Sequence, residues 1–134
     1  MRHVASLALV AAVALSACTT APASKPPMAQ ASPATVLNGK LVGPNQMTLY
    51  VFDRDAAGSG KSVCNGSCAT NWPPLMAPVN AQPIGHWSVV TRDDGGKQWA
   101  YQGKPLYYWA KDSKPGDATG DGVGAERLVS QALK

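Results

Sequence analysis

The stretch Thr48-Leu-Tyr-Val-Phe-Asp-Arg-Asp55 decides the fold class. Its first five residues are β-branched, apolar or aromatic, and acidic residues end the run, a pattern typical of a strand followed by a turn. Successive side chains of a strand point to opposite faces, so Tyr50 and Phe52 are expected on the same face. Asp55 follows where the strand should turn, and its side chain could cap that turn.

The pattern recurs later in the chain. With Tyr50 placed on Tyr107, Phe52 falls on Trp109 and Asp55 falls on Asp112. This repetition predicts two duplicated hairpin units that pack their aromatic faces together into one core.

Further strands are expected between turn signals. They are Trp87–Thr91, Lys97–Tyr101, Leu106–Ala110 and a short final strand at Leu128-Val129. The segment Gln102–Pro105 predicts a short hairpin loop. No window has a helical period long enough to indicate a helix after the N-terminal segment. The predicted fold is therefore a small all-β domain built from duplicated hairpins.

The N-terminus carries a targeting signal. A positive start precedes nine uninterrupted apolar residues, too few for a permanent transmembrane helix, and this is typical of a secretory signal peptide. The segment ends in Leu15-Ser-Ala-Cys18, which resembles a bacterial lipobox. We therefore expect a signal peptide at 1–17, a lipidated Cys18 with a Pro- and Ala-rich flexible linker over 18–37, and a β-rich domain over 38–134. The alternative is cleavage by the ordinary signal peptidase, which would leave Cys18 as a free thiol.

Lipidation predicts attachment to a membrane through Cys18. Thr19, rather than Asp, follows the cysteine, and the usual sorting rule then favours the outer membrane, facing the periplasm. The formal net charge is +4 without a run of like charges, so a nucleic-acid partner is not expected. An envelope polymer or protein is the expected class of partner, and the sequence does not indicate an oligomeric state.

The motifs also support a family assignment. Tyr50-x-Phe52-x-x-Asp55 and Tyr107-x-Trp109-x-x-Asp112 resemble the two copies of the Yx(FWY)xxD motif of a family of secreted-repeat bacterial lipoproteins. Two further segments resemble that family: 64–75, which reads CNGSCATNWPPL, and 103–117, which contains GKPLYYW and DSKPGD. The chain departs from the pattern near its end, where Ala125-Glu-Arg127 stands in place of an aromatic residue. The resemblance implies no activity.

Cys64 and Cys68 predict a disulfide, since a close pair of cysteines in an exported chain usually forms one. A redox pair or a copper-type metal site that uses both cysteines and His86, with Met76 as a further weak candidate, is the alternative. The Cys-x-x-x-Cys spacing differs from thioredoxin-type motifs. No resident cofactor or metal is therefore expected.

The remaining candidates have structural explanations. The loop containing Asp112, Asp117 and Asp121 fails as an EF-hand because Leu128 stands where a bidentate Glu is needed. The four tryptophans could stack on sugars, but core packing is the favoured interpretation. No catalytic constellation is visible, because His86 is the only base candidate in the domain. The sequence thus predicts a membrane-anchored envelope lipoprotein with a non-enzymatic structural or binding role.

Overall fold

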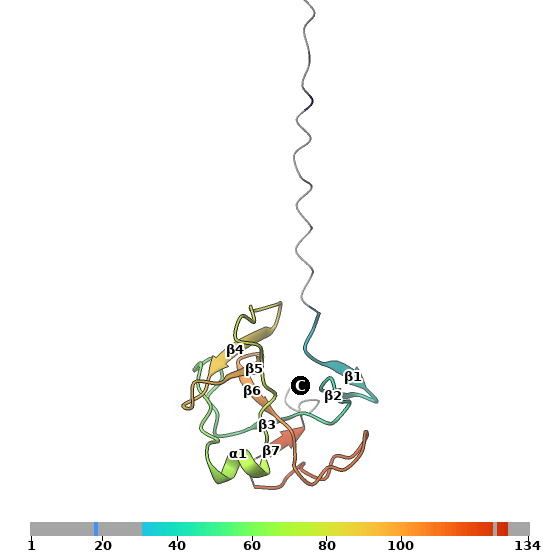
Figure 1. Ribbon diagram of the computed structural model, residues 1–134. Coiled ribbons are helices and arrows are strands. Elements are labelled where there is room, and N and C mark those ends of the chain that lie inside the picture. Colours follow the sequence, from blue (N-terminus) through green and yellow to red (C-terminus); the bar gives the residue numbers. More distant parts are fainter. Residues whose placement is uncertain (1–17, 19–30, 125, 129–134) are drawn as a thin grey trace, which may run out of the picture.

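The computed structural model describes Cys18, residues 31–124 and residues 126–128 (Figure 1). The predicted signal peptide at 1–17 lies outside these residues. Within the described part, no helix is long and apolar enough to cross a membrane. The elements are β1 (Thr35–Leu37), β2 (Lys40–Val42), β3 (Tyr50–Phe52), α1 (Ser67–Asn71), β4 (Trp87–Thr91), β5 (Lys97–Tyr101), β6 (Lys104–Tyr107) and β7 (Glu126–Leu128).

The strands form two antiparallel sheets. β1 and β2 make a two-stranded sheet, and the other strands make a five-stranded sheet in the order β4-β5-β6-β3-β7. The prediction of an all-β fold is confirmed. The short helix α1, which the absence of helical periodicity did not predict, spans five residues after the turn at Gly66.

The two motif copies meet at the centre of the larger sheet. β3 and β6 pair antiparallel with Tyr50 opposite Tyr107 and Val51 opposite Leu106. The copies therefore lie side by side in one sheet, whereas the sequence predicted that two units would pack face to face. Edge-to-edge pairing satisfies the backbone groups of both strands and still places the aromatic residues of both copies on a common face.

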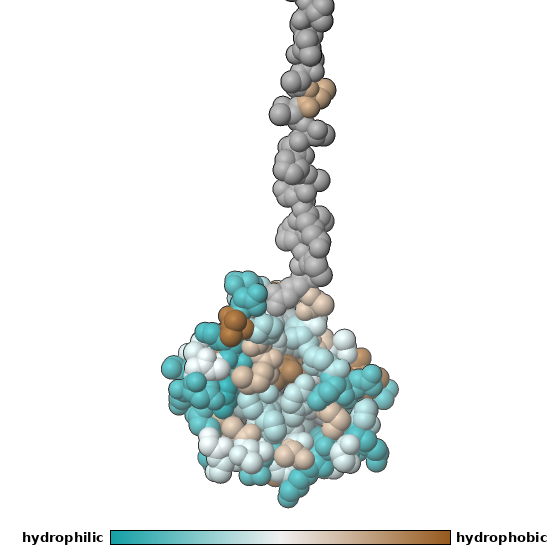
Figure 2. All heavy atoms as spheres, in the orientation of Figure 1, coloured by the Kyte–Doolittle hydropathy of each residue, from teal (hydrophilic) through white to brown (hydrophobic). Residues whose placement is uncertain are grey.

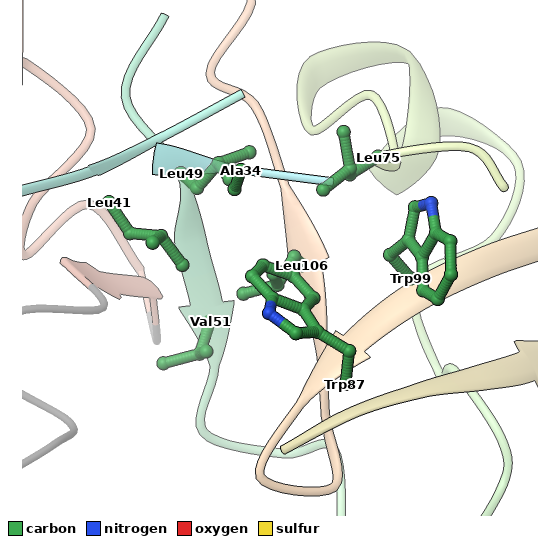
Figure 3. Packing of buried hydrophobic residues seen from close by; sticks show 8 residues of the cluster. All are labelled: Ala34, Leu41, Leu49, Val51, Leu75, Trp87, Trp99 and Leu106. Atoms are coloured by element: carbon green, nitrogen blue, oxygen red, sulfur yellow. The ribbon is translucent and has the colours of Figure 1, made fainter. Parts of the chain in front are cut away.

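Because side chains alternate between the two faces of a strand, the buried residues form two clusters, one on each face of the pair β3 and β6. The first cluster is mainly aliphatic with two tryptophans, and Figure 3 shows its members, which come from β2 to β6 and from segments outside the strands: Ala34, Leu41, Leu49, Val51, Leu75, Trp87, Trp99 and Leu106. The second is the aromatic cluster: Tyr50, Phe52, Cys64, Trp72, Tyr107 and Trp109. The sheet is thus buried on both faces at its centre, and the core is divided between them.

Two of the predicted strands have the bounds that the sequence pattern gave, and the others are shifted or shorter. β4 and β5 begin and end at the predicted residues. β6 starts at Lys104 and ends at Tyr107, whereas the sequence predicted Leu106–Ala110. It starts earlier because the turn before it consists of Gln102 and Gly103 alone, both with positive φ. β7 forms at Glu126–Leu128 although no aromatic residue supports it, and it pairs with β3.

β1 occupies residues that were expected to belong to the linker. Asn38 and Gly39 have φ values of 50° and 74°, the backbone of a two-residue hairpin turn, and they join β1 to β2. All three residues of β1 are exposed, so the strand is held by its pairing with β2 and contributes little to the core. This explains why its burial pattern was not visible in the sequence.

Candidate functional site

The repeat motif forms two hydrogen-bonded pairs, each of which joins one copy to the other. Tyr50 Oη donates to Asp112 Oδ2 at 2.7 Å, and Tyr107 Oη donates to Asp55 Oδ2 at 2.5 Å. Both tyrosines are fully buried, Asp55 is fully buried, and Asp112 is 9% exposed. Each motif tyrosine is therefore bound by the aspartate of the other repeat.

The second oxygen of each aspartate holds the loop that follows its own strand. Asp55 Oδ1 accepts the backbone N–H of Val63 at 2.7 Å. Asp112 Oδ1 accepts the backbone N–H of Thr119 at 2.9 Å and its hydroxyl at 2.7 Å. The prediction that each aspartate marks a turn is confirmed, because the N–H groups of Asp55 and Asp112 close turns onto the carbonyls three residues earlier.

The phenols are neutral donors at physiological pH. Burial raises the pKa of Tyr50 and of Tyr107 well above the ordinary value of 10.0, and the hydrogen bonds to the carboxylates raise both further. Ionising either phenol would place a second negative charge beside an aspartate in the interior. The two Tyr–Asp pairs thus act as structural hydrogen bonds with a charged acceptor.

A buried polar network extends one of these pairs. Ser62 Oγ lies 2.6 Å from Tyr107 Oη and accepts from Arg92 Nη1 at 3.1 Å. The same Nη1 donates to Gln98 Oε1 at 2.7 Å, while Nη2 donates to the carbonyl of Cys64 at 2.7 Å. Arg92 is only 4% exposed. The guanidinium therefore connects residues of both repeats inside the domain.

Sequence reasoning missed this network. Arg92 follows a strand and precedes Asp93-Asp94, a position that is typical of a solvated charge beside a turn. In the structure Nε of Arg92 is 4.0 Å from Asp94, whose side chain is 71% exposed, and a pair so open to solvent contributes little. Gln98 is fully buried in β5 between the half-buried Lys97 and the buried Trp99, so no alternation along the strand marked it as an interior polar residue.

Cys64 and Cys68 form the predicted disulfide, with their Cα atoms 5.2 Å apart. Cys64 is 1% exposed and packs in the aromatic cluster, and Cys68 packs against that cluster. Since Arg92 binds the carbonyl of Cys64, the disulfide and the buried polar network hold the same loop.

The structure does not bring the candidate metal ligands together. His86 is exposed, and its ring contacts Tyr101 with the centroids 6.0 Å apart. Met76 is 52% exposed and forms an isolated bridge with Gln98. Within the described residues no three His, Cys, Asp or Glu side chains cluster as a metal site would require. No observation favours the redox or copper-type alternative.

The four tryptophans belong to the core, as the favoured interpretation predicted: Trp72, Trp87, Trp99 and Trp109 are 4–9% exposed. Trp72 and Trp109 stack with ring centroids 4.1 Å apart. Asp117 organises its own loop, since Oδ2 accepts the backbone N–H groups of Ser113 and Lys114. These hydrogen bonds, that from Ser113 foremost, lower the pKa of Asp117.

Comparison with known proteins identifies the repeats. A lipoprotein family described as a secreted repeat of unknown function matches residues 34–76 and 88–127, more than half of the chain. The chain belongs to this secreted-repeat family. Each matched segment contains one motif copy, so the boundary between the repeats lies between α1 and β4. No curated protein and no solved structure matches the chain.

Membership in a secreted lipoprotein family is consistent with a place in the cell envelope. Cys18 is exposed and lies outside any disulfide, as an attachment site for a lipid must. Lipidation of this residue remains a prediction from the sequence.

Proposed function

We propose that this chain is a lipid-anchored protein of the bacterial cell envelope whose domain has a non-enzymatic structural or binding role. Three features support the proposal: membership in a secreted lipoprotein family, the lipobox-like Leu15–Cys18, and the Pro- and Ala-rich composition before β1. Thr19 after the cysteine favours the outer membrane, with the domain facing the periplasm.

The observation that carries the non-enzymatic role is the exchange of hydrogen bonds between the two motif copies. Tyr50, Asp112, Tyr107 and Asp55 are the chemically most capable side chains of the motif, and all four are committed to one another inside the domain. Across the described residues, every buried side-chain nitrogen and oxygen has a hydrogen-bond partner. The motif residues therefore stabilise the fold, and binding to an envelope polymer or another protein would take place at the surface of the domain.

Expression of the full chain in a bacterium that processes lipoproteins tests the anchor. The protein should enter the membrane fraction, and mass spectrometry of its N-terminal peptide should find Cys18 carrying a diacylglycerol. Cys18→Ser should move the protein to the soluble periplasmic fraction.

A variant with both Cys64→Ser and Cys68→Ser is the matched control, because it removes the other two cysteines and should remain in the membrane fraction. A processed protein with an unmodified thiol at Cys18 would refute the proposal. Copurifying metal that is lost on replacing His86 would refute the non-enzymatic, metal-free interpretation of the domain.

A further inference from the structure

Apolar side chains are exposed around the point where the described chain enters the domain. Val36 on β1 is 72% exposed, Val79 in the loop before β4 is 91% exposed, and Met76 in the same loop is 52% exposed. We call these three residues the entry face. The continuous described segment begins at residue 31, at the upper side of the domain in Figure 1. Figure 2 shows apolar side chains (beige to brown) among hydrophilic ones on the upper part of the domain in the same view.

A groove connects the entry face to the start of the described chain. It has a volume of about 310 Å³ and is lined by Ala31, Pro33, Pro44, Leu75, Met76, Pro78 and Trp99. The lining is mostly apolar, so residues 31–33 and the loop before β4 form one continuous apolar surface. Val36 follows Pro33 by three residues, and Val79 adjoins Pro78.

The fold itself does not explain this exposure. β1 pairs only with β2 among the described strands, and Val36 belongs to neither core cluster. Val79 sits within a tight turn closed by the hydrogen bond from Ala81 N to the carbonyl of Pro78, at 3.0 Å. An exposed valine at such a turn contributes nothing to the core and is more stable when an apolar phase covers it.

The length of the segment between Cys18 and the domain indicates that the apolar phase is the lipid bilayer. Residues 19–30 separate Cys18 from Ala31, and twelve residues can span at most about 43 Å. A domain attached so closely to a lipid on Cys18 meets the bilayer at a high effective concentration, on the order of millimolar. A weak apolar contact is then sufficient to hold it there, and the side that faces the lipid first is the side where the chain enters.

We propose that the entry face of Val36, Met76 and Val79 docks on the surface of the same bilayer that holds the lipid of Cys18. The proposal rests on the lipid anchor proposed above. Docking would fix the orientation of the domain, with the entry face down and the loop between β6 and β7, which runs along the lower side of the domain in Figure 1, directed away from the membrane.

Depth-dependent quenching in the lipidated protein tests this proposal. An environment-sensitive fluorophore is attached at Val79→Cys in full-length lipoprotein that is reconstituted in vesicles of phosphatidylethanolamine and phosphatidylglycerol. Lipids with a nitroxide on the acyl chain then report contact with the bilayer. Val123→Cys is the matched control, since Val123 is also an exposed valine (40%) but lies in the loop between β6 and β7.

We expect quenching to be several-fold stronger for the probe at position 79 than for the probe at 123. Val36→Asp should reduce the quenching at 79 substantially without releasing the protein from the vesicles, because the lipid still anchors it. Equal, weak quenching at both positions in vesicle-bound protein would overturn the docking proposal alone. Protein that lacks the lipid and does not float with vesicles would instead overturn the anchor.

Discussion

Tyr50 and Tyr107 lie directly opposite each other on β3 and β6, yet each phenol binds the aspartate of the other repeat. The aspartates reach across because each follows its strand through a tight turn and returns toward the neighbouring strand. The two donor phenols therefore lie together at the centre of the sheet, and the two acceptor carboxylates approach them from opposite ends of the strand pair.

Removing one phenol should destabilise the domain markedly. Tyr107→Phe leaves the buried Oδ2 of Asp55 without its donor, and we expect a loss of about 1–3 kcal/mol in the free energy of unfolding. Urea unfolding followed by tryptophan fluorescence measures the change. Tyr101→Phe is the control, because Tyr101 is only partly buried, and it should cost much less. Equal losses for the two variants would contradict the role of the Tyr–Asp pair.

The exchange should also appear as energetic coupling between the repeats. Tyr50→Phe and Asp112→Asn remove two ends of one hydrogen bond, so their combined cost should be less than the sum of their separate costs. Tyr50→Phe combined with Asp55→Asn changes two residues of the same motif copy that do not bind each other. Equally strong coupling in both double variants would contradict the interpretation that the hydrogen bonds between the repeats couple their stabilities.

Stability should fall at alkaline pH. The pKa values of Tyr50 and Tyr107 are raised in the folded state, so the folded protein holds both protons after the unfolded chain begins to lose them near pH 10.0. The stabilisation is complete below that pH and is lost as the pH rises toward the raised values, by about 1.4 kcal/mol per pH unit for each group. The urea midpoint should decrease between pH 9 and pH 11, and the decrease should be smaller in Tyr107→Phe. A midpoint that is constant over this range would exclude the mechanism.

The disulfide should contribute a moderate local stabilisation. It closes a very short loop, for which chain entropy gives about 2 kcal/mol, so replacing both Cys64 and Cys68 by Ser should leave a folded domain with a lower urea midpoint. Loss of all cooperative unfolding would show that the disulfide, rather than the two core clusters, holds the domain. Cys18→Ser should leave the midpoint unchanged.

A methyl group at position 120 should not fit. A Cβ on Gly120 would lie 2.8 Å from Cη2 of Trp72 and 2.9 Å from Cγ of Trp109, two stacked rings that cannot move independently. Gly120→Ala should therefore cost about 1–3 kcal/mol by overpacking. At Gly96 the nearest atoms belong to the ends of the Asp94 and Met76 side chains, which can rotate away, so Gly96→Ala should cost less. The reverse order in thermal unfolding would contradict this packing.

The strands could be predicted wherever a residue's local pattern also determined its burial. β4 and β5 combine β-branched or aromatic residues with a clear Asp-Asp-Gly-Gly stop, and their bounds agree with the sequence. β1 was not predicted because its three residues are exposed and leave no alternating pattern, although Asn38-Gly39 forms the hairpin turn that follows it. The pairing of β3 with β6 could not be derived, since periodicity gives the face of a residue and not the neighbour of its strand.

The sequence predicted which residues belong to the candidate site but not which residues form hydrogen bonds with one another. The spacing of Tyr50, Phe52 and Asp55 identified the repeated motif, and the short spacing of Cys64 and Cys68 predicted the disulfide between them. The burial of Arg92 depends on where the loop 62–65 folds back over β5, and no short-range signal contains that information. The sequence does not distinguish an aspartate that only caps a turn from one that also accepts a hydrogen bond from the other repeat.

The crossed Tyr–Asp pairs also constrain how such a chain can evolve. Each repeat donates what the other accepts, so a chain with one repeat alone would expose an unmatched phenol and an unmatched carboxylate. Two such chains would satisfy each other as a symmetric dimer, with the same four groups around a two-fold axis. Fusion of the two halves into one polypeptide removes the dependence of that pairing on protein concentration, and afterwards a change in one copy of the motif destabilises the domain unless the other copy changes to compensate.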